Sequence, residues 1–160
     1  MGDITYVWSA EGWCYVAVLH DLYGRRVVGW AIASHLRVEL PLKALQRALA
    51  TRKPPPGLLH HTDRGSQYAS AQYQTLLREH EVACSMSRAG DCYDNAVAES
   101  FFASLKKECL HRRAFATRTE VDDAVAAYID GFYNPVRRHS SAEYLSPIDF
   151  EHRNMLAHAV

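Results

Sequence analysis

The sequence lacks the features that mark secreted, disulfide-bonded and membrane proteins. It has four cysteines in 160 residues, and no two of them form a C-x-x-C pair, so a zinc knot is not predicted. No apolar run approaches the roughly 18 residues that a membrane-spanning helix needs. Residues 1–3, Met-Gly-Asp, do not begin a signal peptide. We therefore expect a cytoplasmic protein with reduced thiols and no membrane partner.

An excess of positive charge is also missing. The 18 Lys and Arg residues balance the 18 Asp and Glu residues, which gives a formal net charge of zero with neutral histidines. Proteins that bind nucleic acid usually show a basic excess. Basic residues nevertheless gather at 106–118 and at 137–139, and a neutral total can hide one basic face. Solvated helix faces are the alternative interpretation of both clusters.

The order of hydrophobic patterns predicts one α/β domain. Strands are expected at 3–8, 13–19 and 27–32, followed by a helix at 39–51, a strand at 58–61 and a helix at 69–80. A strand at 82–86, a helix beginning after Asp94 and a long helix at 119–133 complete the pattern. A helical crossover returns the next strand parallel to the sheet. The prediction is a five-stranded mixed sheet, three antiparallel strands then two parallel, with helices on both faces.

The chain is expected to divide into a core at 1–135 and a basic and polar C-terminal tail at 136–160. The tail follows the Asn-Pro pair at 134–135 that ends the last predicted helix. We expect it to pack on the core or to extend it.

Three acidic residues stand in polar stretches beside regular elements: Asp3, Asp63 and Glu99. Asp63 follows a predicted strand, and 35 residues separate it from Glu99. If the fourth strand pairs beside the first, Asp63 comes close to Asp3. Three carboxylates can hold two hard cations and leave room for water and phosphate. Capping and surface salt bridges are the alternative interpretation.

Polar and basic residues border these acids and suit contacts with phosphates or base edges. Local loop bonding is the alternative role for each of them. Two further residues of the tail either bind DNA or cap the last helix. The candidates are Arg64, Gln67, Ser87, Arg88, Asn95, Arg138 and His139.

The adjacent pair His60 and His61 does not predict a zinc site. Successive residues of a strand point to opposite faces of the sheet, so the two rings cannot easily share one ion. One of them is a candidate neighbour of the acidic site.

The chain resembles the catalytic domain of insertion-sequence transposases of the retroviral-integrase (DDE) superfamily. The similarity covers nearly the whole chain, in the order expected for the family. The matching stretches are Asp-Ile-Thr-Tyr at 3–6, Val-Gly-Trp at 28–30, His-Thr-Asp-Arg-Gly-Ser-Gln-Tyr at 61–68, Asp-Asn-Ala at 94–96, Glu-Ser-Phe-Phe at 99–102, Tyr-Asn at 133–134, Arg-His-Ser at 138–140 and Tyr-Leu-Ser-Pro at 144–147.

The resemblance implies a ribonuclease H-like fold in which Asp3, Asp63 and Glu99 are the catalytic acids. It implies that Lys106 contacts DNA near the transposon end. The activity expected is divalent-metal-dependent phosphodiester cleavage and strand transfer, with two Mg²⁺ ions that Mn²⁺ can replace. The expected partners are transposon-end and target DNA and further copies of the chain, in a homodimer or higher oligomer in the bacterial cytosol.

Two other functions stay open. Members of the family usually carry residues before the first acid and an upstream helical DNA-binding region, whereas Asp3 is the third residue here. Sequence-specific recognition of transposon ends is therefore expected to need more than this polypeptide. The main alternative is a truncated, non-catalytic protein that associates with DNA or regulates transposition. The other is a general metal-dependent nuclease of the same fold.

Overall fold

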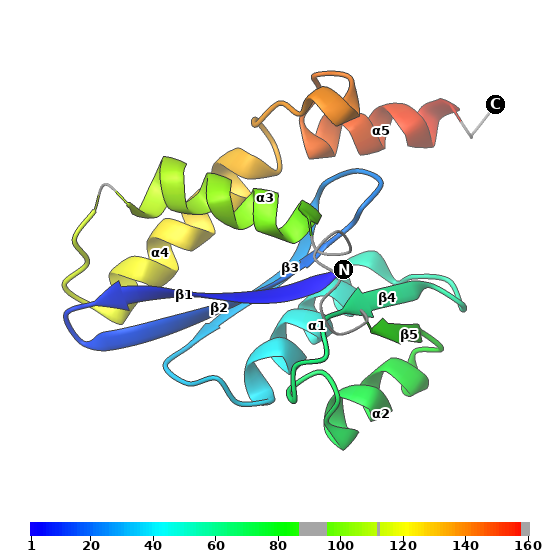
Figure 1. The fold of residues 1–160 in the computed structure, drawn as a ribbon. Helices are drawn as coiled ribbons and strands as arrows, with labels where there is room; N and C mark the ends of the chain where they lie inside the picture. The colour runs from blue at the N-terminus through cyan, green and yellow to red at the C-terminus, as the bar shows by residue number, and fades with distance from the viewer. Residues whose placement is uncertain (87–95, 112, 158–160) are drawn as a thin grey trace.

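A mixed five-stranded sheet forms the centre of the protein (Figure 1). The computed structural model describes residues 1–86, 96–111 and 113–157. Strands β1 (Gly2–Ser9), β2 (Gly12–His20) and β3 (Val27–Ala33) are antiparallel, and β4 (Leu59–Thr62) and β5 (Ala83–Met86) run parallel to β1. The strand order is β3-β2-β1-β4-β5, which confirms the predicted sheet.

The β1–β2 hairpin closes through a tight turn. Ser9 pairs with Gly12 across the turn, and Gly12 has a φ of +110°, which glycine adopts without steric cost. The turn is also held from outside, since the Ala10 amide donates to the Phe115 carbonyl at 2.9 Å. This end of the hairpin is therefore fixed against the segment around Phe115.

Helices cover both faces of the sheet. Helix α1 (Glu39–Arg52) packs on β2 and β3, and α2 (Ala71–Glu79) on β5. Helices α3 (Ala96–Leu105) and α4 (Arg118–Tyr128) pack on β1 from the opposite face (Figure 1). Side chains alternate between the two faces of the sheet along β1. Val7 joins the core under α3 and α4, and Ile4 packs on the core under α1.

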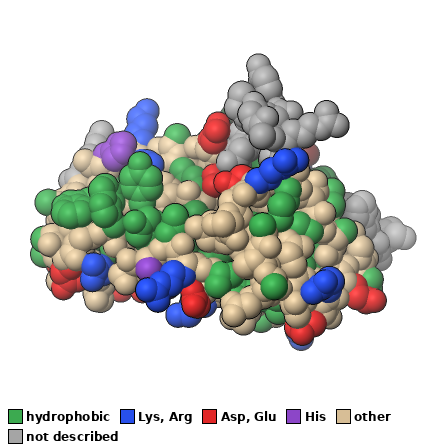
Figure 2. All heavy atoms as spheres, turned by 60° about the horizontal axis from the view of Figure 1, so that its bottom comes forward, with side chains coloured by type: hydrophobic (Ala, Val, Ile, Leu, Met, Phe, Trp, Pro, Cys, Tyr) green, Lys and Arg blue, Asp and Glu red, His purple; other side chains and the backbone are tan. Residues whose placement is uncertain are grey.

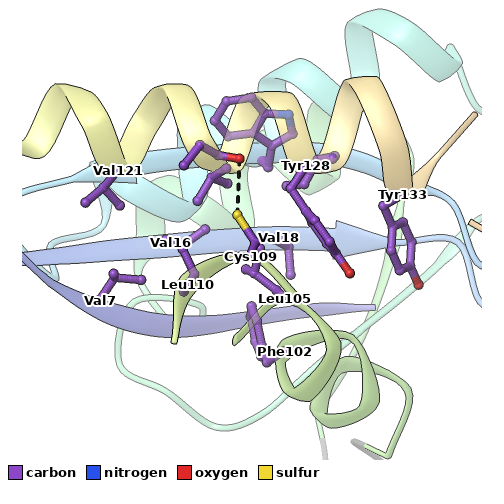
Figure 3. Packing of buried hydrophobic residues seen from close by; sticks show 14 of the residues in the cluster. Val7, Val16, Val18, Phe102, Leu105, Cys109, Leu110, Val121, Tyr128 and Tyr133 are labelled. Carbon is purple, nitrogen blue, oxygen red and sulfur yellow. Dashed lines mark hydrogen bonds between the residues drawn. The ribbon is translucent and has the colours of Figure 1, made fainter. Parts of the chain in front are cut away.

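Apolar side chains from α3, α4 and the central strands fill the core on the α3 side. Figure 3 shows Phe102 and Leu105 of α3 and Val121 of α4 directed toward Val16 and Val18 of β2. The Cys109 thiol also lies here and donates to the Ala124 carbonyl at 3.5 Å (Figure 3). This core holds α3, and thus the first turn that carries Glu99, across β1.

Helices α3 and α4 each continue directly into a π-helical turn, which the sequence pattern did not predict. These turns are η2 (Lys106–Leu110) and η3 (Ile129–Tyr133). After η3, Asn134 is buried, and its amide accepts from the Val27 N–H and donates to the Val27 carbonyl, both at 3.0 Å. The wider turn brings Asn134 into register with the start of β3.

The segment 136–160 contains a 3-10 turn, η4 (Ser140–Ala142), and a helix, α5 (Pro147–Ala157), that the sequence analysis did not anticipate. Ser146 caps α5 by accepting from the Asp149 N–H at 3.2 Å, and Pro147 occupies the first helical position. Glu151, 7% exposed, forms ion pairs with Arg26 and Arg52. Helix α5 is thus anchored to the loop before β3 and to the end of α1.

No helix in the described part of the chain is long and apolar enough to cross a membrane. Three cysteines, Cys14, Cys84 and Cys109, are free thiols.

Candidate metal and phosphodiester site

The parallel pairing of β1 with β4 brings two of the predicted acids together. Gly2 pairs with Thr62, so the residues that follow them, Asp3 and Asp63, occupy neighbouring positions. Adjacent strands lie about 4.8 Å apart. The position of Asp63 immediately after β4 is what brings its carboxylate beside Asp3.

Backbone amides fix one oxygen of each carboxylate. The Ile4 N–H donates to Asp3 Oδ1 at 2.7 Å, and the Gly65 N–H donates to Asp63 Oδ1 at 2.9 Å. A Cβ on Gly65 would lie 2.9 Å from the same Asp63 oxygen, so the turn after β4 leaves little space there for a side chain. Both acids are thereby oriented by the backbone around them.

The phenol of Tyr68 lies next to this pair. Tyr68 is 2% exposed, and its hydroxyl has no hydrogen-bond partner among the described residues. Burial raises the pKa of Tyr68 well above its usual value, and the charges of Tyr73, Asp3 and Asp63 raise it further. The hydroxyl therefore stays protonated and can donate to a carboxylate or to a water bound between the acids. Sequence reasoning placed Tyr68 in the motif but gave it no role.

Glu99 lies on the same side of the sheet as Asp3. It belongs to the first turn of α3 and is exposed, directly after the fully buried Ala98. Asp3 alternates with Ile4 along β1 and so faces the α3 side with Val7. Among the described residues, no three His, Cys, Asp or Glu side chains lie close enough to hold a metal ion. The structure gives Asp3 and Asp63 neighbouring positions, and no three-ligand group that includes Glu99 forms among the described residues.

The two adjacent histidines have separate partners. His60 is buried and its Nε2 lies 2.9 Å from the Tyr73 hydroxyl, whereas His61 Nδ1 lies 3.1 Å from Ser85 Oγ. Burial lowers the pKa of His60 to about 3, with smaller contributions from the N-terminal amine and His61. His60 is therefore neutral at pH 7 and packed between the sheet and α2.

The residues predicted to contact DNA are dispersed. Lys106 begins η2, and its Nζ lies 5.4 Å from the centre of the Tyr6 ring. Arg64 is exposed immediately after Asp63, and Arg138 is exposed after η3. The Gln67 amide donates to the Leu36 carbonyl at 3.2 Å. Three further candidates, Ser87, Arg88 and Asn95, lie outside the described residues.

His139 is held within the protein. Its ring stacks edge-on against Tyr133, with 5.0 Å between ring centres. Burial, followed by the charges of Arg137 and Arg25, lowers the pKa of His139 to about 4. The ring is thus neutral at pH 7, and a contribution to DNA contact would come from hydrogen bonding rather than from charge.

The neighbouring Arg137, which belongs to the basic cluster at 137–139, binds Glu108 through Nε and Nη2 at 3.0–3.2 Å. The Tyr128 hydroxyl donates to the same carboxylate at 2.6 Å. The hydrogen bond from Arg137 is the main cause that lowers the pKa of Glu108. This network ties η2 to the end of α4, so the guanidinium is engaged in structure.

Comparisons with known proteins agree with the fold. A family model described as "Integrase core domain" matches residues 1–92, and a second model with the same description matches residues 80–147. The transposase InsF for insertion sequence IS3A of Escherichia coli K12 is 49% identical over 154 residues, covering 96% of this chain and 54% of the relative. A transposase for insertion sequence element IS904 of Lactococcus lactis is 43% identical, covering 96% and 61%.

Solved structures of low sequence identity share the fold. The simian T-cell lymphotropic virus intasome in complex with PP2A regulatory subunit B56 gamma matches with a TM-score of 0.76 at 16% identity, over 94% of this chain and 52% of that one. The HTLV-2 integrase catalytic core domain in complex with magnesium matches with a TM-score of 0.69 at 15% identity, over 94% and 93%. These likenesses confirm the ribonuclease H-like fold.

The present chain spans about half the length of the curated relatives that it matches. Its mixed sheet, its paired carboxylates and the family match over more than half of its residues lead to one assignment. The chain belongs to the integrase core domain family, together with the transposases of insertion sequences.

Proposed function

We propose that the chain is the catalytic core of a DNA transposase that cleaves phosphodiester bonds at transposon ends and joins them to target DNA. The observation that supports this proposal is the Gly2–Thr62 pairing, since Asp3 and Asp63 are the residues that follow the paired positions. Membership in a family with insertion-sequence transposases supports it.

The residues at the site fit a divalent-metal centre. Carboxylate oxygens are the hard donors that Mg²⁺ and Mn²⁺ prefer, and Asp3, Asp63 and Glu99 would hold two such ions. When bound, paired ions stabilise the attacking and leaving oxygens of an in-line displacement at phosphorus. The magnesium in the HTLV-2 integrase structure of the same fold supports this assignment.

Within this proposal, the protein supplies orientation. The amides of Ile4 and Gly65 hold one oxygen of each aspartate. The Tyr68 hydroxyl, which has no hydrogen-bond partner among the described residues, would donate to the acids or to a water between them. Arg64, which directly follows Asp63, would contact the phosphates of the transposon end, as would Lys106 and Arg138. We expect two or more copies of the chain to act together in the bacterial cytosol.

One observation favours the alternative of a DNA-associating protein that does not cut. Glu99 does not join the two aspartates in a three-ligand group among the described residues. If this spacing persists when DNA and metal are present, the chain would bind DNA and lack catalysis.

A cleavage assay separates the two functions. Labelled duplex ends are incubated with Mg²⁺ or Mn²⁺ and the wild-type protein, Asp63→Asn or Glu99→Gln. The account predicts metal-dependent nicking that falls roughly a hundredfold or more in both variants. Glu79→Gln, which alters an exposed acid at the end of α2, is the matched control and should nick at the wild-type rate. Equal retention of DNA without nicking by all four proteins would establish the alternative.

A further inference from the structure

Three large aromatic side chains stand exposed on the β1–β2 hairpin. Tyr6 and Trp8 are each 57% exposed and Trp13 is 45% exposed. Trp8 and Trp13 are directly paired across the strands, with ring centres 4.9 Å apart, and Tyr6 lies 5.1 Å from Trp13. On the left of Figure 2, where Figure 1 places this hairpin, hydrophobic side chains gather on the surface. We refer to Tyr6, Trp8 and Trp13 as the aromatic platform.

The platform borders a hollow of about 560 Å³ between the hairpin and the segment after α3. Lys106, His111 and Arg113 line the hollow together with the platform, and none of its described lining residues is acidic. Lys106 begins η2 on the other side of the sheet and reaches the Tyr6 ring. The hollow therefore combines ring faces with positive charge, in a chain whose net charge is zero.

Side chains from both faces of the sheet line this hollow, because it lies along the free edge of β1. Strand β4 pairs with β1 only at Gly2, so the described strands leave the edge of β1 beyond that residue uncovered. Along the strand, at about 3.3 Å per residue, Tyr6 lies roughly 10 Å from Asp3 and Trp8 roughly 17 Å from it. A polymer strand that leaves the acidic pair along this edge would pass Lys106 and then reach the platform.

Cross-strand aromatic pairs also stabilise hairpins, and this role accounts for the contact between Trp8 and Trp13. It does not account for three exposed rings beside a group of cations. Exposed aromatic rings next to basic residues are the chemistry that binds unpaired nucleotides, because bases stack on the rings and phosphates lie against the cations. Within a duplex the base faces are covered by their neighbours, so only unpaired bases can stack in this way.

We infer that the aromatic platform and the hollow bind an unpaired DNA strand of a few nucleotides next to the acidic site. The inference rests on the proposed function, because it extends the path of DNA from the acids. Tyr6, Trp8 and Trp13 stack on the bases, and Lys106, His111 and Arg113 lie against the phosphates. Blunt duplex DNA can contact this surface only through its phosphates, because its bases are stacked on one another.

The test is binding of a fluorescein-labelled 12-nucleotide oligo(dT) and of a blunt duplex, both in EDTA so that no cleavage occurs. Trp8→Ala should weaken single-strand binding about tenfold and duplex binding less than about twofold. Trp8→Phe should restore most of the affinity, because it retains a ring. Tyr144→Ala removes an aromatic that is 70% exposed and outside the hollow, and should change neither.

Two further measurements do not depend on whether the Trp8→Ala variant folds correctly. Trp30, the third tryptophan, is buried beneath the Arg47 guanidinium, so oligo(dT) should quench tryptophan emission from the platform of the wild-type protein. Arg113→Gln should reduce the slope of log affinity against log salt by about 0.7 for the single strand.

The inference is overturned if Trp8→Ala binds oligo(dT) as wild type does, or if it loses single-strand and duplex affinity equally. A dimer that dissociates in Trp8→Ala with unchanged oligo(dT) affinity would also overturn it and assign the platform to a second copy. Nicking is measured separately with metal. Loss of nicking with intact oligo(dT) binding would remove only the proposed function.

Discussion

At the scale of residues, a glycine sets how closely α1 approaches the sheet. A Cβ built on Gly29 of β3 would lie 2.2 Å from the Ala44 carbonyl oxygen and 2.8 Å from the Ala48 Cβ. Both are atoms of α1, and the first belongs to the backbone, so the helix itself would have to move. The Val-Gly-Trp stretch at 28–30 is therefore a packing requirement of the fold.

Gly29→Ala is predicted to reduce the free energy of unfolding by about 2–3 kcal/mol, because a methyl group is forced into a filled contact. Urea denaturation at pH 7.5 measures it. Gly131→Ala is the matched control, because a Cβ there meets nothing within 4 Å in a helical turn. The control should be neutral or stabilising by up to about 1 kcal/mol. Equal stability of the two variants would contradict this account of the contact.

At the same scale, the candidate site was only partly predictable. The neighbourhood of Asp3 and Asp63 followed from the expected parallel pairing, which needs only the order of the elements. The buried Tyr68 hydroxyl and the amides that hold the two carboxylates could not be inferred, since they depend on the path of the turn after β4. The aromatic platform had a signal in the sequence, namely large rings at same-face positions of a predicted hairpin.

At the scale of elements, ion pairs hold α5 in addition to the packing of its buried Phe150. Glu151 is 7% exposed, whereas its partners Arg26 and Arg52 are about one quarter exposed. A carboxylate that holds two arginines from separate elements links the C-terminal segment to the core. In the Arg153–Glu143 pair of the same segment, by contrast, both side chains are exposed.

Glu151→Gln is predicted to cost about 1–3 kcal/mol, because it removes the buried carboxylate that pairs with Arg26 and leaves Arg52 with Asp21 alone. Limited proteolysis should then cleave near 136–146 several times faster than in the wild type. Arg153→Gln, the control at the exposed pair, should cost less than about 1 kcal/mol and leave the proteolysis rate unchanged. Similar effects in both variants would rule out Glu151 as the anchor.

Elements differ in how far the sequence predicts them. The five strands and helices α1 to α4 follow from clear hydrophobic periods. Helix α5 was not predicted, although Ser146 as its cap and Pro147 as its first residue are typical of a helix start. The π-turns are invisible to periodicity, because a single extra residue per turn is imposed by tertiary contacts such as that of Asn134 with Val27.

At the scale of the whole molecule, buried neutral histidines make stability depend on pH. Burial lowers the pKa of His20 to about 3, and the N-terminal amine and Arg25 lower it further. Neither ring nitrogen of His20 has a hydrogen-bond partner among the described residues, and the pKa of His60 is lowered similarly. An unfolded chain takes up protons on these rings below about pH 6.5, and the folded chain does not.

Stability is therefore predicted to fall as the pH drops from about 6.5 toward 3, by up to about 1.4 kcal/mol per pH unit for each histidine whose pKa is lowered. Above pH 7 this contribution to stability is fully present. Urea denaturation at pH 7.5, 6.5 and 5.5 measures the slope, and His111→Gln, at an exposed histidine, should leave it unchanged. A flat profile between pH 6.5 and 5.5 would show that these rings are protonated in the folded protein.

The central claim concerns the molecule as a metal-dependent core, and locating Mn²⁺ in its crystals tests it most directly. The account predicts anomalous density between the carboxylates of Asp3 and Asp63, with Glu99 drawn toward it, and loss of that density in Asp63→Asn. Mn²⁺ bound only at other positions, with Asp3 and Asp63 contacting protein atoms alone, would contradict the account.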